Sequence, residues 1–278
     1  SEDFGLQGEW PTHPELLDWL AVEFRESGWD QRHMLRLILS SDTYRRSARV
    51  DPQLAQRDPD NRLLARYPRR RLSAEEIRDL ALYVSGLLVE KAGGPSVKPY
   101  QPDGLWEEVA MLQSNTRVFQ RGEGEDLWRR SLYTYWKRAA PPPSMLTFDA
   151  PTREFCTIRR TTTNTPLQAL VLWNDEQFRE AARELAERTL REGGNGDERL
   201  ARMYLRTTGK VADEPVLEAL RANLERHRTR YRGDTEAAQS MLQAGLSPRD
   251  EQLDAAELAA WTMVASALLS LDATLCRS

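Results

Sequence analysis

Apolar residues recur every three or four positions in several stretches of the chain, which is the spacing of one face of an α-helix. In the clearest stretch, Ser73 and Glu76 form a capping box ahead of apolar positions that continue to Leu88, and Gly93 follows. Further helices are predicted from Thr12 to Gly28, from Asp30 to about Leu39, from about 166 to 191, and onward from Asp213, Ser247 and Asp254. The pattern therefore predicts a mainly α-helical protein.

The segment between about 94 and 165 lacks this regularity. Prolines, glycines and scattered aromatic residues interrupt it, and "LWRRSLYTYWKR" (127–138) fits a short helix or a strand equally well. We therefore predict an irregular helical domain with a loop-rich middle segment (about 94–165) and little β structure. One domain over 1–278, as a fragment of a larger protein, is expected. The alternative is a subdivision into the loop-rich middle and the C-terminal helices, 166–278.

Composition and charge argue against several classes of protein. The net charge is −4, which disfavours a nucleic-acid surface, and no apolar run approaches the roughly 18 residues that a membrane-spanning helix needs. None of the three histidines has a metal-binding partner at short spacing, and no Cys-x-x-Cys motif is present. We therefore expect no metal site and no cofactor in this chain.

The two cysteines, Cys156 and Cys276, lie far apart in the sequence. In an oxidising compartment they could form a long-range disulfide. The alternative is two small, buried thiols, and we expect the cysteines to be unpaired.

The candidate chemistry is concentrated in "RRTTTNTPLQALVLWND", residues 159–175. Thr165, Pro166 and Gln168 are of the types that favour the N-cap, N1 and N3 positions of a helix, so a helix start explains much of this cluster. The free amide groups of such a helix end, with guanidinium groups nearby, can also bind an anion. The predicted anion-site residues are Arg153, Arg159, Arg160, Asn164 and Thr165.

Two acidic residues near this cluster, Asp149 and Glu154, leave two interpretations open. In an enzyme they would act as acid and base beside the anion site. In the alternative, Arg159 and Arg160 bind these carboxylates inside the fold, because arginine–carboxylate networks commonly tie down irregular loops. We favour the structural interpretation, and the sequence assigns no catalytic residue.

Several sequence blocks together resemble one known family. The resemblance covers nearly the whole chain and rests on "PTHPELLDWLA" (11–21), "DPDNRLLAR" (58–66), "RLSAEEIRD" (71–79), "GGPSVKPYQPDGLWEE" (93–108), "RRSLYTYWKR" (129–138), "FDAPTREFCTIRRTTTNTPLQALVLWND" (148–175) and "ELAAWTMVASALLSLDATL" (257–275). These blocks are similar to a C-terminal domain of unknown function that is abundant in planctomycetes and related bacteria. One departure is Glu176, where the family pattern has a proline.

The resemblance implies a module within a larger, exported protein, located in the periplasm or at the cell surface. In that family the domain follows a sister domain of unknown function, and a cytochrome c-like domain often lies nearer the N-terminus. Haem, if the parent protein binds it, is therefore expected on a separate domain. The resemblance supplies no catalytic residues.

Three functional hypotheses follow. The leading one is a non-catalytic helical interaction module of an extracytoplasmic bacterial protein, which packs on the sister domain or binds a surface ligand. The second is a hydrolase or an anionic-polysaccharide-binding domain with a site around residues 145–165, and the third is an accessory to a haem electron-transfer domain. A deep pocket holding Asp149, Arg153, Arg159 and Arg160 favours the enzyme, whereas a flat, exposed apolar face favours the interaction module.

Overall fold

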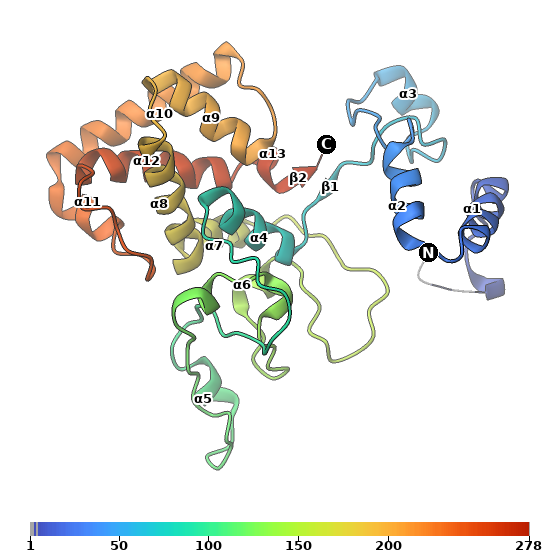
Figure 1. Ribbon diagram of the computed structural model, residues 1–278, viewed down its shortest axis with the longest axis horizontal. Coiled ribbons are helices and arrows are strands. Elements are labelled where there is room, and N and C mark those ends of the chain that lie inside the picture. The colour runs from blue at the N-terminus through green and yellow to red at the C-terminus, as the bar shows by residue number, and fades with distance from the viewer. Residues whose placement is uncertain (1–2, 4, 278) are drawn as a thin grey trace. The chain divides into compact units, whose positions relative to one another are not determined.

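The computed structural model describes residue 3 and residues 5–277, and the chain forms two compact units. The smaller unit comprises Ser1–Arg70 with Cys276–Ser278, and the larger comprises Arg71–Leu275 (Figure 1). The boundary between them falls next to the predicted capping box at Ser73, and not at the edges of the loop-rich middle. The two units are referred to below as unit 1 and unit 2.

The described residues of unit 1 form three α-helices and a short 3-10 helix, with the bounds η1 Gly5–Gln7, α1 Pro14–Glu26, α2 Gln31–Ser40 and α3 Pro52–Arg57. Helix α1 ends before Gly28, whose φ of +71° suits glycine, and α2 begins where the side chain of Asp30 accepts hydrogen bonds from the amides of Arg32 and His33. The side chains of Glu23 and His33 join the two helices at 2.7 Å. The sequence predicted both helices.

Unit 2 is built from ten α-helices within its described residues, mostly packed around one apolar core. Their bounds are α4 Ala74–Ser85, α5 Leu105–Val109, α6 Pro143–Thr147, α7 Pro166–Asn174, α8 Glu176–Arg191, α9 Gly196–Thr208, α10 Glu214–Gly233, α11 Thr235–Met241, α12 Ala255–Leu269 and α13 Asp272–Leu275. In Figure 1, α8 crosses α12 while α10 runs alongside α12. Helix α12 lies at the centre of the core and buries residues around most of its circumference.

In two places the structure shows which residues end or divide the predicted helices. Helix α4 has the predicted capping box between Ser73 and Glu76, but it ends at Gly86, where a φ of +90° takes the backbone into the left-handed region. The stretch predicted to be helical from about 166 to 191 forms two helices that meet at Asp175, whose carboxylate caps α8 by accepting from the Gln177 amide. Asn174, the last residue of α7, is exposed and donates to the Leu170 carbonyl at 2.9 Å.

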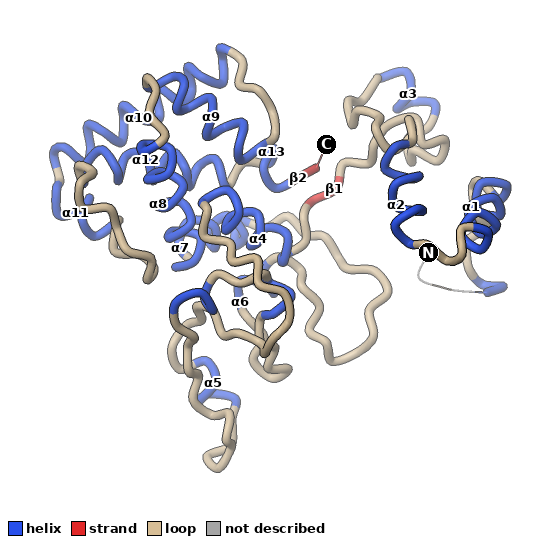
Figure 2. Tube along the Cα trace, in the orientation of Figure 1, coloured by secondary structure: helices blue, strands red, loops and turns tan. Residues whose placement is uncertain are grey.

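The middle segment is loop-rich, as predicted, and Figure 2 shows how little of it is helical. Besides α5 and α6 it contains two short 3-10 helices, η2 Gly124–Leu127 and η3 Ser131–Tyr133. The strands found in the described part of the chain are β1 Arg70–Arg71 and β2 Cys276–Arg277, which pair with each other. The prediction of a mainly α protein with little β structure is therefore confirmed.

Buried arginines attach the middle segment to the helices. Arg78 of α4 donates to the carbonyls of Leu127 and Arg129, each at 2.8 Å, and to Ser131 Oγ at 3.1 Å. The guanidinium of Arg129 in turn donates to the carbonyls of residues 91, 93 and 95. Backbone carbonyls of an irregular loop need such donors when they are removed from water.

Helix α8 holds a second segment, residues 242–252, through buried charged side chains. Both oxygens of Glu180 are used: Oε1 accepts from Tyr100 Oη and from the amides of Leu246 and Ser247, and Oε2 accepts from Trp128 Nε1. These four bonds are 2.7–3.1 Å long, and Glu180 is fully buried. A carboxylate in the interior is tolerated only when its oxygens are hydrogen-bonded in this way.

Candidate interaction surface

The residues predicted to form an anion site lie on an exposed loop between α6 and α7, which Figure 2 shows as a long excursion. Residues 152–167 are all exposed. Asp149, at the base of the loop, accepts hydrogen bonds from the amide and hydroxyl of Thr163, both at 2.8 Å, and forms an ion pair with Arg71 at 3.2 Å. Arg71 also donates to Gln168 Oε1 at 2.9 Å. Asp149 therefore closes the loop at its base.

The arginines of the loop have partners other than those expected. Arg160 forms a two-pronged ion pair with Glu75 of α4, with N–O distances of 2.6 and 3.1 Å. Burial raises the pKa of Glu75, but its hydrogen bond to Arg160 and the charge of Arg160 outweigh burial, so that the pKa lies below its ordinary value. The guanidinium of Arg153 lies 4.4 Å from the ring centroid of Trp136. The expectation that Arg159 and Arg160 bind Asp149 and Glu154 was wrong in its choice of partners.

The remaining predicted site residues do not gather around a cavity. Glu154, Arg159 and Asn164 are exposed on the loop, and Thr165 precedes α7, where its amide donates to Gln168 Oε1 at 3.2 Å. The two cavities described in unit 2 are lined by residues of α4, α8 and α9 and by the segment 239–249 with Arg183. The loop is thus held mainly at its base, by contacts that position the start of α7.

Because the Arg160–Glu75 ion pair is partly exposed, removing it should change the stability of the protein only slightly. Arg160→Ala should lower the free energy of unfolding by less than about 1 kcal/mol, because exposed ion pairs contribute little even with good geometry; the Arg160 side chain is 44% exposed. Urea unfolding monitored by tryptophan fluorescence measures the change. Arg71→Ala, which opens the base of the loop, is the contrasting variant and should cost more. A loss near 3 kcal/mol for Arg160→Ala would contradict this assignment.

Unit 1 presents an apolar surface that its own residues do not cover. No residue of α1, α2 or α3 is buried, and Asp58 is the one buried residue among the described part of this unit. The side chains that form this surface are between 41% and 58% exposed. They are Leu16, Leu17, Trp19 and Val22 of α1, with Leu35, Ile38 and Leu39 of α2. We call this set the α1–α2 apolar surface.

The two helices that carry this surface are linked chiefly by peripheral contacts. Besides the Glu23–His33 bond, the rings of Phe24 and Trp29 meet edge to face, with centroids 5.1 Å apart. The sequence predicted both helices from their apolar spacing. Helical spacing identifies an apolar face, but it does not tell whether the same chain covers it.

Cys156 lies exposed on the loop, so the expectation that it is buried was wrong. Cys276 is half-buried in β2. Among the residues that the structure describes, no three His, Cys, Asp or Glu side chains are placed to hold a metal ion. No helix of residues 3 and 5–277 is both long and apolar enough to cross a bilayer.

Sequence reasoning missed one group of charged residues. Arg188 of α8 and Arg202 and Arg206 of α9 line a common cavity. The four-residue spacing of Arg202 and Arg206 places both on one face of a helix, which was the available signal. The third arginine comes from another helix, and only the packing of α8 against α9 brings it to the others.

Comparison with known proteins places the chain in a family and goes no further. No curated protein and no solved structure matches it. The family profile described as PSD1, protein of unknown function (DUF1553), matches residues 1–224, which include all of unit 1 up to Arg70, the exposed loop and the three arginines. The last of the sequence blocks quoted above, 257–275, lies beyond the match. Since the match covers most of the chain, this protein belongs to the PSD1 family of proteins of unknown function.

Proposed function

We propose that this chain is a non-catalytic interaction module that docks on a neighbouring folded domain through the α1–α2 apolar surface. The observation that carries the proposal is the absence of buried apolar residues from α1, α2 and α3 within the described residues. Exposed apolar side chains gathered on neighbouring helices in this number are typical of protein interaction sites. The partner we assign is the sister domain that the family resemblance implies, in an extracytoplasmic protein.

The charges of α1 favour a protein partner over a lipid surface. Within its thirteen residues α1 carries four acidic side chains and one basic side chain, Arg25. Helices that lie on membranes are instead rich in lysine and arginine, which attract anionic lipid headgroups. The surface also includes Trp19 together with several leucines, and tryptophan is enriched among the residues that dominate protein interfaces.

The exposed loop supports this proposal and not the hydrolase alternative. Both oxygens of Asp149, the carboxylate considered for acid–base chemistry, are engaged by Thr163 and Arg71. Glu154, its proposed companion, is exposed in the open loop. A general acid or base must lie within hydrogen-bond reach of a bound substrate. The contacts of Asp149 instead hold the base of the loop together.

A binding measurement tests the docking proposal. The full chain is titrated with the separately produced sister domain in a calorimeter, and Leu17→Asp combined with Ile38→Asp is compared with wild type. Burying one such side chain contributes roughly 1.5–3 kcal/mol, so the double variant should weaken binding at least about 100-fold. The matched control is Val211→Asp, which places the same charge on an 84% exposed apolar residue of unit 2 and should leave affinity unchanged.

Three results would overturn the proposal. The first is a wild-type chain that does not bind the sister domain, and the second is a double variant that binds it as tightly as wild type. The third is a different occupant of the same surface. Dimers seen by light scattering and lost in the double variant would indicate a second copy of the chain. Binding to vesicles of phosphatidylcholine and phosphatidylglycerol, lost in the same variant, would indicate a membrane.

A further inference from the structure

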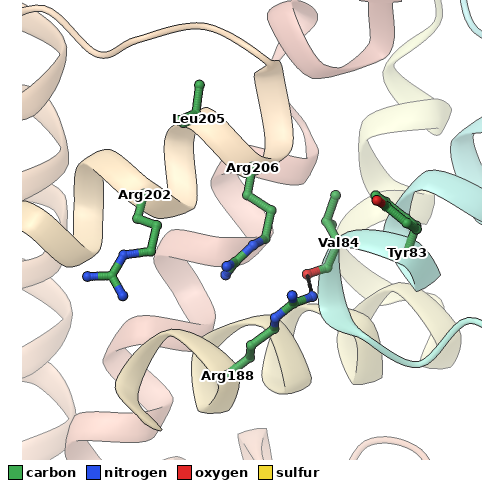
Figure 3. A pocket seen from close by; sticks show the side chains of 6 residues that line it. All are labelled: Tyr83, Val84, Arg188, Arg202, Leu205 and Arg206. Atoms are coloured by element: carbon green, nitrogen blue, oxygen red, sulfur yellow. Dashed lines mark hydrogen bonds between the residues drawn. The ribbon is translucent and has the colours of Figure 1, made fainter. Parts of the chain in front are cut away.

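A cavity of about 400 Å³ in unit 2 gathers three guanidinium groups beside apolar side chains. Its lining consists of Tyr83 and Val84 from α4, Arg188 from α8, and Arg202, Leu205 and Arg206 from α9. Figure 3 shows the head of Arg206 between those of Arg188 and Arg202, with Arg188 hydrogen-bonded to Val84. All six residues belong to unit 2, and none of them takes part in the α1–α2 apolar surface.

The positive charge of this cavity exceeds the negative charge that faces it. The three arginines share one carboxylate, that of Glu192 at the C-terminal end of α8. Arg206 donates to both Glu192 oxygens, at 2.8 and 2.9 Å, while Arg188 and Arg202 reach the same carboxylate at 3.2 and 3.4 Å. Among the contacts described for these side chains, three positive charges therefore meet one negative charge, which leaves an excess of two.

The three guanidinium groups are held in place before any ligand arrives. Arg188 donates to the Val84 carbonyl at 3.3 Å, and Arg202 donates to the Gly193 carbonyl at 3.2 Å. Arg206 is 19% exposed, and its Nη1 is removed from solvent without a hydrogen-bond acceptor. A buried donor with no acceptor is costly, so Glu192 alone leaves the hydrogen-bonding capacity of the Arg206 guanidinium incompletely used.

We infer that this cavity binds a phosphate monoester, a doubly charged oxyanion carried on a ligand with a ring. The excess of two positive charges matches the charge of phosphate, and planar guanidinium groups donate paired hydrogen bonds to such oxygens. The apolar side of the cavity is formed by Tyr83, which is 63% exposed, and Leu205, which is 46% exposed. Their exposure leaves a surface on which the ring of the ligand packs.

A purely structural role for the arginines makes a different prediction. If they serve only to hold Glu192 and the end of α8, added oxyanions bind no more tightly than chloride. The Tyr83 ring then makes no difference to any anion. Ligand-binding measurements therefore distinguish the oxyanion site from a purely structural role of the arginines. Neither account depends on whether the α1–α2 apolar surface docks on a partner.

The test is calorimetric titration of the full chain with inorganic phosphate, inorganic sulfate, phenyl phosphate and phenyl sulfate at constant ionic strength. Phenyl phosphate should bind wild type at least about tenfold more tightly than inorganic phosphate. Phenyl sulfate, which carries one negative charge instead of two, should bind more weakly than phenyl phosphate. Arg206→Gln should weaken binding of phenyl phosphate at least about tenfold, because hydrogen bonds to charged groups contribute about 1.5–3 kcal/mol. Tyr83→Ala should remove the advantage of phenyl phosphate over inorganic phosphate.

Arg221→Gln is the matched control, because Arg221 also makes two ion pairs, with Asp197 and Glu214, but does not line the cavity. It should leave every affinity unchanged. Tyr83→Ala, at an exposed position, keeps the test informative if Arg206→Gln fails to fold. The inference is overturned if wild type binds none of the four ligands more tightly than chloride, if Arg221→Gln weakens binding as much as Arg206→Gln, or if Tyr83→Ala leaves the phenyl advantage intact.

Discussion

Gly245→Ala is expected to lower the free energy of unfolding of unit 2 by about 3–5 kcal/mol. Gly245 has a φ of +83°, which strains any residue with a Cβ atom. A Cβ atom at this position would also overlap the carboxyl group of Glu180. That carboxylate is fully buried and accepts four hydrogen bonds from other segments, so it cannot move aside without leaving donors unpaired.

Two glycine controls separate the components of this effect, and urea unfolding measures all three variants. Gly209 has a φ of +71°, but a Cβ atom added there would meet nothing within 4 Å, so Gly209→Ala reports backbone strain alone, about 1 kcal/mol. Gly233 lies at the end of α10 with open space around it and ordinary φ, so Gly233→Ala should be neutral or slightly stabilising. If Gly245→Ala lowered the free energy of unfolding no more than Gly209→Ala does, the overlap with Glu180 would contribute nothing to the loss.

Arg78→Met should destabilise unit 2 by a similar amount, about 3–5 kcal/mol, and should loosen the loop-rich middle in particular. Burial lowers the pKa of Arg78 to about 10, so the side chain is still charged at neutral pH. Methionine fills much of the same space but donates no hydrogen bonds. The Arg129 carbonyl would lose the donor that Arg78 supplies, and Asp79 would lose a neighbouring cation.

Amide hydrogen exchange of residues 89–135, alongside urea unfolding, measures the second prediction. Protection should fall in this segment before it falls in α8 or α12, because the backbone carbonyls that accept hydrogen bonds from Arg78 belong to this segment. Arg130→Met is the matched control: Arg130 is 59% exposed and approaches Asp79 only at 3.6 Å. Equal losses for the two methionine variants would show that burial of Arg78 is not what makes it important.

The apolar pattern predicted the elements that form the core. The positions chosen for the last predicted helix, from Leu258 to Leu269, are buried in α12, and the apolar face of α8 from Phe178 to Leu185 lies against it. Capping chemistry placed the start of α4 correctly, because Ser73 and Glu76 act on amide groups within one helical turn. Signals of this kind are local, and the sequence displays them directly.

Contacts between distant segments could not be predicted in the same way. Glu180, Arg183 and Glu187 lie on successive turns of α8, a pattern typical of a solvated helix face, yet all three are buried because residues 242–252 cover them. The choice of Glu75 as the partner of Arg160 depends equally on where α4 lies relative to the loop. Every nearby carboxylate is an equivalent candidate until the fold selects one.

The position of α12 late in the chain affects how the protein folds during its synthesis on the ribosome. The side of α8 that packs against α12 has no cover until synthesis has passed Leu269, although α4 and α7, which are made earlier, also contact α8. At usual elongation rates, that interval lasts roughly 4–16 s after α8 has been translated. The nascent chain must therefore carry α8 with one apolar side uncovered for seconds, an interval in which chaperones that bind apolar segments have access to it.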